Sequence, residues 1–124
     1  MTQRKTILFV EDEDELLATV GLVLREKGYD VVAVKSAEDA LKLLKKTSPD
    51  LILADIKLPG IDGLDFFQLV RRDEQTKRTP FIFLTAFNNL AAAVNAKKQG
   101  AADYITKPFE VEHLVERVRE LLPT

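Results

Sequence analysis

The sequence predicts an α/β fold in which helices cover both faces of a parallel sheet. Five short, mainly apolar segments of four residues each are spread along the chain, and they have the length and composition of buried strands. Longer segments between them carry apolar residues at every third or fourth position, as amphipathic helices do. Strands that alternate with helices form βαβ units, whose strands run parallel. The predicted strands are residues 7–10, 31–34, 51–54, 81–84 and 102–105.

The first two helices have recognisable ends. Gly28 is typical of a helix stop, and it closes the helix after the first strand. Ser36 and Asp39 match a capping box, which opens the second helix, and Pro49 ends that segment. The inward-facing residues expected in these two helices are Leu16, Leu17, Val20, Val23 and Leu24, then Ala37, Ala40, Leu41 and Leu44.

A turn after the third strand leads into the third helix. Pro59 fixes φ there, while Gly60 and Gly63 permit a backbone course that a β-carbon would hinder. Further on, Asn88 is expected to cap a short alanine-rich helix that Gly100 closes. The inward-facing residues expected in the third and last helices are Leu64, Phe67 and Val70, then Leu114, Val115, Val118, Leu121 and Leu122.

These elements fit one domain, which spans residues 1–124. Five parallel strands with five helices predict a flavodoxin-like, doubly wound sheet with the strand order 2-1-3-4-5. The crossovers between the strands are expected to be right-handed. No internal repeat, low-complexity segment or linker interrupts the pattern.

The composition argues against several classes of function. Hydrophobic residues make up 46% and charged residues 31% of the chain, which is typical of a globular domain. A net charge of −2 provides no basic excess to neutralise phosphates, so we expect no direct binding to nucleic acid. The absence of cysteine excludes disulfides and cysteine metal sites. Since neither a signal peptide nor a membrane span is recognisable, we expect a cytoplasmic chain without membrane contact.

Polar residues follow four of the five predicted strands at the point where each strand ends. Glu11 and Asp12 follow the first strand, Asp55 the third, Thr85 the fourth and Lys107 the fifth. In the order 2-1-3-4-5 these strands are neighbours about 4.8 Å apart, so the side chains converge at one edge. Carboxylates packed this closely repel one another unless a cation joins them, and all-oxygen ligands favour Mg²⁺, Mn²⁺ or Ca²⁺ over zinc. The set predicts phosphoryl transfer onto Asp55, with the metal, Lys107 and Thr85 stabilising the phosphoryl oxygens.

Each of these residues has an ordinary structural explanation when it is taken alone. Asp55 could merely cap the turn that follows it, and the acidic run 11–15 suits the solvated start of a helix. A threonine at a strand end is usually a cap, and a Lys-Pro pair is usually a turn. Their joint placement at the ends of the right strands favours the functional interpretation. Asp14 and Glu15 are still expected to be only solvated.

The chain resembles the receiver domains of two-component response regulators over essentially its whole length. The segments that carry the resemblance are Ile7-Leu-Phe-Val-Glu-Asp12, Asp50-Leu-Ile-Leu-Ala-Asp55, Leu58-Pro-Gly-Ile-Asp-Gly63, Phe83-Leu-Thr-Ala86 and Gly100-Ala-Ala-Asp-Tyr-Ile-Thr-Lys-Pro-Phe109. The resemblance implies a signalling domain that accepts a phosphoryl group from the phosphohistidine of a sensor histidine kinase or a histidine phosphotransfer protein. Such a domain acts on a downstream protein target, and it is a monomer or a weak, phosphorylation-dependent dimer. It assists its own phosphotransfer and dephosphorylation, and it is not an enzyme in the usual sense.

The resemblance also implies a role for each acidic residue. Asp55 is the phosphoryl acceptor. Asp12 and Asp55 bind Mg²⁺ directly, the main-chain carbonyl of Lys57 is a further ligand, and Mn²⁺ is an expected substitute for Mg²⁺. Glu11 acts through water, and it stands where the family more often has Asp.

The remaining site residues are implied in the same way. Thr85 and Lys107 bind the phosphoryl group, and the bond between Lys107 and Pro108 is expected to be cis. Tyr104 matches the aromatic residue that changes position with Thr85 when the domain is phosphorylated. The surface formed by the fourth helix, fifth strand and fifth helix is expected to change with them.

Three other functions compete with this interpretation. A phosphohydrolase of the haloacid dehalogenase type would need a second carboxylate two residues after Asp55, where this chain has Lys57. A flavodoxin would cradle phosphate in its first loop, but the run 11–13 is acidic and would repel it. A pseudo-receiver, which binds proteins without being phosphorylated, is the main alternative. His113 is the one histidine, and we expect a solvated surface residue there rather than a phosphoryl carrier.

Two further positions bear on how long the phosphoryl group persists. In receiver domains, the residues two places after the acceptor and two places after the threonine lie where water approaches the phosphorus. Here they are Lys57 and Phe87, and neither orients water as a carboxylate or an amide does. The resemblance therefore predicts slow self-dephosphorylation.

Overall fold

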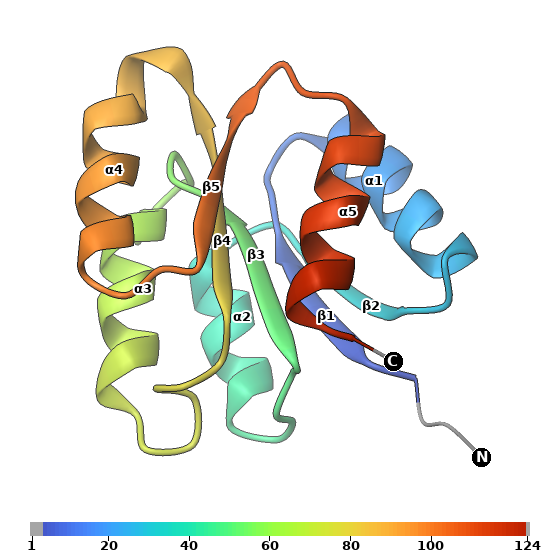
Figure 1. The fold of residues 1–124 in the computed structure, drawn as a ribbon. Coiled ribbons are helices and arrows are strands. Elements are labelled where there is room, and N and C mark those ends of the chain that lie inside the picture. Colours follow the sequence, from blue (N-terminus) through green and yellow to red (C-terminus); the bar gives the residue numbers. More distant parts are fainter. Residues whose placement is uncertain (1–3, 124) are drawn as a thin grey trace.

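A computed structural model describes residues 4–123 of the chain, and its described part contains one five-stranded sheet (Figure 1). All neighbouring strands pair in parallel, in the order β2-β1-β3-β4-β5. This confirms the predicted fold class and strand order. The strands are β1 (Thr6–Val10), β2 (Asp30–Val34), β3 (Leu51–Asp55), β4 (Phe81–Ala86) and β5 (Asp103–Lys107).

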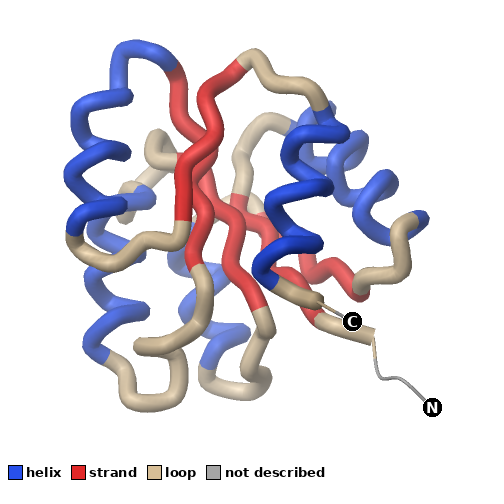
Figure 2. Tube along the Cα trace, in the orientation of Figure 1, coloured by secondary structure: helices blue, strands red, loops and turns tan. Residues whose placement is uncertain are grey.

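The helices of the described residues lie in two layers, one on each face of the sheet (Figure 2). α1 and α5 cover one face, and α2, α3 and α4 cover the other (Figure 1). None of these helices is long and apolar enough to cross a membrane. Their bounds are α1 (Asp14–Glu26), α2 (Ala37–Leu44), α3 (Gly63–Arg72), α4 (Leu90–Lys98) and α5 (Val111–Leu121), with a short 3-10 turn η1 (Phe87–Asn89) before α4.

Two hydrophobic clusters hold these layers to the sheet. Successive residues of a strand point to opposite faces, so each strand contributes to both clusters. In β1, for example, Ile7 and Phe9 pack against α1 and α5, whereas Leu8 and Val10 pack against the other helices. On the side of α3, four aromatic rings lie with neighbouring centroids 4.7–5.7 Å apart: Phe66, Phe67, Phe81 and Phe83.

Helix starts follow the predicted caps in one case and depart from them in another. The hydroxyl oxygen of Ser36 accepts a hydrogen bond from the Asp39 amide at 3.1 Å, as a helix cap does. Asn88 does not cap α4, so that prediction was wrong. Asn88 lies inside the turn η1, and the cap position falls to Asn89, whose side chain makes no capping hydrogen bond.

The turn between β3 and α3 depends on both of its predicted glycines. Gly60 has a φ of +71°, a conformation that costs energy for residues with a β-carbon. Gly63 has no such φ, but a β-carbon there would lie 2.1 Å from the carbonyl oxygen of Asp55. Because Gly63 has no side chain, its amide approaches closely and donates to the Ile56 carbonyl at 2.7 Å. The start of α3 is therefore packed directly against the end of β3.

Candidate functional site

The carboxyl ends of β1, β3, β4 and β5 bring the predicted site residues to one edge of the sheet. Asp55 is the last residue of β3 and Glu11 directly follows β1. Thr85 and Lys107 are themselves strand residues, because β4 continues to Ala86 and β5 continues to Lys107. The predicted ends of these strands, Leu84 and Ile105, were therefore too early. The pairing of Thr85 with Thr106 and of Ala86 with Lys107 holds Thr85 and Lys107 more firmly than a loop would.

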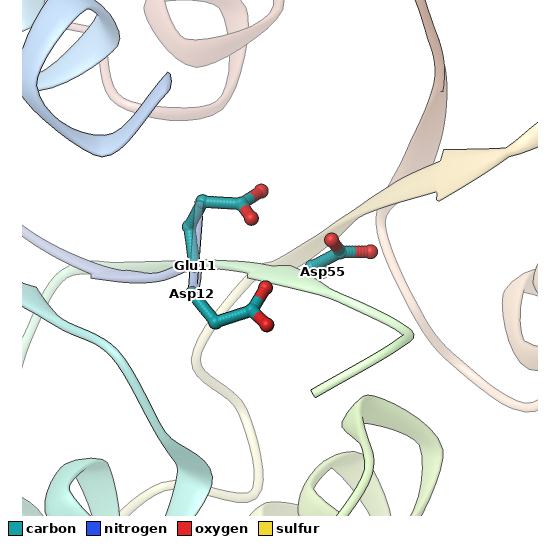
Figure 3. Close-up of side chains that lie close together, drawn as sticks. All are labelled: Glu11, Asp12 and Asp55. Atoms are coloured by element: carbon teal, nitrogen blue, oxygen red, sulfur yellow. The ribbon is translucent and has the colours of Figure 1, made fainter. Parts of the chain in front are cut away.

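Three carboxylates form the centre of the site (Figure 3). Ligand oxygens of Glu11, Asp12 and Asp55 all lie within 4.8 Å of one another. Glu11 is fully buried and Asp55 is 7% exposed, whereas Asp12 is exposed to solvent. Among the described residues, Glu11 and Asp55 are the buried charged ones, and buried charge requires a compensating partner.

Lys107 supplies that partner. Its Nζ donates to Oε1 of Glu11 and to Oδ2 of Asp55, both at 2.8 Å. Burial lowers the pKa of Lys107, but the hydrogen bonds to Asp55 and Glu11 and the negative charges of these two residues together outweigh it, so the pKa is raised and the ammonium form is favoured. Burial also raises the pKa of Glu11, against the opposing effect of its hydrogen bonds from Lys107 and the Glu13 amide. The two 2.8 Å contacts are those of an ion pair, and they hold Lys107 between both carboxylates.

Backbone amides orient the second oxygen of each buried carboxylate. The Glu13 amide donates to Oε2 of Glu11 at 3.1 Å, and the Lys57 amide donates to Oδ1 of Asp55 at 3.2 Å. Each carboxylate therefore accepts from Lys107 on one oxygen and from an amide on the other. These two amides could not be predicted from the sequence, because any residue type other than proline supplies the same backbone group.

The cluster has the composition of a site for a hard divalent cation. Three carboxylates and one ammonium leave an excess of two negative charges when all are ionised. Carboxylate oxygens are the ligands that Mg²⁺ and Mn²⁺ prefer in proteins. Asp12 is exposed and takes no part in the Lys107 contacts, so its oxygens are free to bind an ion from solvent.

Thr85 and Tyr104 lie on the strands next to this cluster. Thr85 is fully buried, and its hydroxyl donates to the carbonyl oxygen of Ala86 at 3.0 Å. Tyr104 pairs with Phe83 across β4 and β5 and is half-buried against the α2–α4 side of the core. The Nζ of Lys97 lies 5.9 Å from the centre of its ring. The Lys107-Pro108 bond is cis, as the resemblance implied.

An apolar hollow adjoins Lys107 between α1 and the start of α5. Its volume is about 380 Å³, and apolar side chains such as Leu16, Val20 and Phe109 line it together with Glu13. Leu16 and Val20 were expected to face the core, so this hollow was not predicted from the sequence. The hollow depends on how the loop after Pro108 is spaced from α1, which no local pattern encodes.

The other residues singled out from the sequence lie apart from these contacts. The side chain of Lys57 is exposed, and so is that of His113 on α5. The prediction for Phe87 concerns a side chain outside the described part of the structure. Asp14, which was expected to be only solvated, is exposed but forms an ion pair with Lys35 at 2.6 Å.

Comparison with known proteins identifies relatives along nearly the whole chain. The pattern of the response regulator receiver domain family matches residues 7–119. The transcriptional regulatory protein AfsQ1 of Streptomyces coelicolor is 40% identical over 117 residues, which cover 94% of this chain and 51% of that protein. The DNA-binding response regulator MtrA of Mycobacterium tuberculosis is 37% identical over 121 residues, which cover 98% of this chain and 52% of that protein. The chain thus spans about half the length of the curated relatives it matches.

Solved structures of similar proteins share the course of this chain's backbone. A protein assigned as a response regulator in Chloroflexus aurantiacus is 39% identical, with a TM-score of 0.91, and the match covers 98% of this chain and 100% of that chain. The chemotaxis response regulator CheY4 of Vibrio cholerae is 28% identical, with a TM-score of 0.89, over 97% of this chain and 100% of that chain. With a family match over residues 7–119, this chain belongs to the response regulator receiver domains.

Proposed function

We propose that the chain is a phosphorylation-operated receiver that accepts a phosphoryl group on Asp55 from the phosphohistidine of a sensor histidine kinase or a histidine phosphotransfer protein. The observation that carries this proposal is the setting of the Asp55 carboxylate. It ends β3 within a cluster of carboxylates, and Lys107 donates to its Oδ2 at 2.8 Å. A nucleophilic carboxylate with a fixed ammonium beside it is suited to phosphoryl transfer.

The transfer exchanges one bond to phosphorus for another. The bond between phosphorus and the imidazole nitrogen of the donor breaks, and a carboxylate oxygen of Asp55 forms the new bond. The electron pair of the broken bond stays on the imidazole, which takes up a proton. Lys107 balances the charge of the phosphoryl oxygens, and the Thr85 hydroxyl turns from Ala86 to donate to one of them.

The carboxylates of Glu11, Asp12 and Asp55, with the main-chain carbonyl of Lys57, would hold Mg²⁺, for which Mn²⁺ would substitute. The ion, when bound, supplies positive charge that offsets the phosphoryl oxygens. Supporting this assignment are the excess negative charge of the cluster and the exposure of Asp12. Glu11 keeps its hydrogen bond to Lys107 in this scheme and acts on the ion through water.

Phosphorylation is proposed to act on a protein target through the surface of α4, β5 and α5. Thr85 moves toward the phosphoryl group, and Tyr104 moves into the space that Thr85 leaves. Phosphorylation thereby shifts the population of molecules from the state without these movements to the state with them. In support of this, the carboxylate of Asp103 in β5 forms ion pairs with Lys97 of α4 at 3.4 Å and with Arg117 of α5 at 2.5 Å, and these contacts link the three elements. We expect a cytoplasmic monomer or a weak phosphorylation-dependent dimer, which assists its own phosphotransfer and dephosphorylation rather than acting as an enzyme with turnover.

Direct binding to nucleic acid is not part of this proposal. MtrA is described as DNA-binding, but this chain covers only 52% of that protein. A net charge of −2 gives this chain no general attraction for phosphate backbones.

The proposal is tested by supplying a small-molecule phosphodonor with Mg²⁺ and measuring the mass of the intact chain. We expect a gain of one phosphoryl group in the wild type, and no gain in Asp55→Asn or when a chelator replaces the metal. A wild-type chain that gains no mass, although Mg²⁺ binds, would support the pseudo-receiver alternative instead.

A further inference from the structure

The loop between β3 and α3, residues 56–62, is held from outside by a residue that the mechanism does not use. The carboxylate of Glu38, in the first turn of α2, accepts a hydrogen bond from the Ile61 amide at 3.0 Å. The same carboxylate lies against Gly60, where a β-carbon would be 2.2 Å from Oε2 of Glu38. Two observations, one polar and one steric, therefore place this carboxylate on the outer part of the loop.

We propose that Glu38 is a positioning residue that holds the β3–α3 loop and, through it, the backbone of Lys57 beside Asp55. The inference rests on the proposed function, which assigns the Lys57 carbonyl to the metal. It adds a residue from α2 to a site that otherwise draws on the ends of β1, β3, β4 and β5.

The contacts along the loop explain why its outer part needs such support. At the base of the loop, the Ile56 amide donates to the Leu84 carbonyl at 3.2 Å, and the Ile56 carbonyl accepts from the Gly63 amide at 2.7 Å. Near the site, the Lys57 amide donates to Asp55 Oδ1 at 3.2 Å.

Beyond Lys57 the support becomes weaker. Leu58 is buried, but Pro59 and Gly60 are exposed. Within residues 4–123, two side chains outside the loop accept a hydrogen bond from it: Asp55 at its base, from Lys57, and Glu38 on its outer part, from Ile61.

Glycine at position 60 makes this contact possible. Its φ of +71° turns the chain so that the next amide, that of Ile61, points at α2. Because Gly60 has no side chain, the carboxylate of Glu38 can occupy the space beside the Cα of Gly60. Loss of the carboxylate leaves the Ile61 amide to solvent and frees the stretch 59–61. This increases the range of positions open to the Lys57 backbone, which lies four residues before Ile61.

The test compares Glu38→Ala with two matched variants in the full chain. Glu38→Gln retains an oxygen that can accept from Ile61 but removes the charge. Asp39→Ala removes an exposed carboxylate from the same turn of α2, and among the described residues this carboxylate makes no hydrogen bond or ion pair with the loop. Amide hydrogen exchange at Ile61 and Lys57 reports loop opening, and a Mg²⁺ titration followed by NMR reports the dissociation constant.

We expect Glu38→Ala to exchange roughly threefold to tenfold faster at both amides, the range that one net hydrogen bond supplies. Its affinity for Mg²⁺ should fall by a similar factor, and phosphorylation by a small phosphodonor should recover when Mg²⁺ is raised to saturation. Glu38→Gln should retain most of both properties, and Asp39→Ala should match the wild type.

Three results would overturn the inference. One is exchange at Lys57 that does not change in Glu38→Ala. Another is a loss of Mg²⁺ affinity in Glu38→Gln as large as in Glu38→Ala, which would make the effect one of charge alone. The third is a loss of Mg²⁺ affinity in Asp39→Ala that equals the loss in Glu38→Ala. A wild type that takes no phosphoryl group would contradict the proposed function, while exchange at Lys57 would still decide whether Glu38 holds the loop.

Discussion

Asp12 differs from Glu11 and Asp55 in that its carboxylate is exposed and is not contacted by Lys107. In the metal-free protein it adds a negative charge to a cluster that already carries an excess. Asp12→Asn should therefore raise the free energy of unfolding without metal by about 1 kcal/mol, the repulsion of two unit charges roughly 5 Å apart in water. The same substitution should remove most of the stabilisation that Mg²⁺ gives the wild type.

Thermal melts with and without Mg²⁺ measure both effects of Asp12→Asn. The matched control is Glu15→Gln, which removes an exposed carboxylate from the same acidic run but outside the cluster. A metal-free Asp12→Asn protein that melts below the wild type would show that repulsion in the cluster does not limit stability.

Lys57 and Phe87 are expected to set the lifetime of the phosphorylated state. As side-chain types, neither accepts a hydrogen bond from water, so neither orients water for attack on phosphorus. Replacing them together, Lys57→Asn with Phe87→Glu, should speed the loss of phosphate by about a factor of 10, which is roughly 1.4 kcal/mol of barrier. Decay of labelled phosphoprotein after removal of the donor, with Mg²⁺ in excess, measures this rate.

The control for the change of charge uses two exposed positions away from the site, Lys45→Asn with Leu22→Glu. It should leave the decay rate unchanged. If the Lys57 and Phe87 substitutions also leave the rate unchanged, these two positions do not govern the approach of water.

The side-chain contacts of the site were only partly predictable. The sequence predicted that Glu11, Asp12, Asp55 and Lys107 would meet, because residues at the ends of neighbouring parallel strands share one edge of the sheet. It did not predict that Lys107 would bridge Glu11 and Asp55. That contact depends on rotamers and on depth of burial, neither of which follows from strand ends.

The link between α4, β5 and α5 depends on the carboxylate of Asp103. Burial acts to raise the pKa of Asp103, but the Tyr104 amide and the cations of Arg117 and Lys97 outweigh it and hold the pKa below its ordinary 3.8. A folded pKa below the unfolded one means that the charged carboxylate stabilises the fold above 3.8, and that this contribution is lost as the pH falls through the folded pKa.

Asp103→Asn should therefore cost about 1–2 kcal/mol of unfolding free energy at neutral pH and almost nothing well below pH 3.8. Urea unfolding of the wild type and Asp103→Asn at a series of pH values measures this cost at neutral pH and at low pH. The control is Asp30→Asn, which removes the exposed ion pair with Arg4 and should cost at most about 0.5 kcal/mol at any pH. A cost of Asp103→Asn that does not change with pH would show that its charge is not what links these elements.

The ends of elements were harder to predict than their existence. β4 and β5 continue past their apolar runs, since pairing of Thr85 with Thr106 and of Ala86 with Lys107 extends the ladder through polar residues. α4 begins later than predicted because the 3-10 turn η1 takes up Asn88. In both cases contacts with other parts of the chain override the local pattern.

The layered architecture was predictable from the alternation of short apolar strands with amphipathic helices. The pattern did not predict how far each residue of an element is buried by the rest of the chain. Val32 of β2 is 36% exposed because β2 is an edge strand, although its sequence is as apolar as that of a central one. Phe66 is fully buried although it was not assigned to the inner face of α3, because its ring packs against that of Phe81 in the core.

The proposed function depends most directly on one assignment, which is that Asp55 carries the phosphoryl group. Borohydride reduces an acyl phosphate to an alcohol, so treating the phosphorylated chain and sequencing its peptides by mass spectrometry locates the acceptor. We predict that the reduced residue is Asp55, as homoserine, and that Asp55→Asn yields no reduced residue. Reduction at another carboxylate such as Asp12, or an acid-labile phosphoryl group on His113 with Asp55 unmodified, would contradict this prediction.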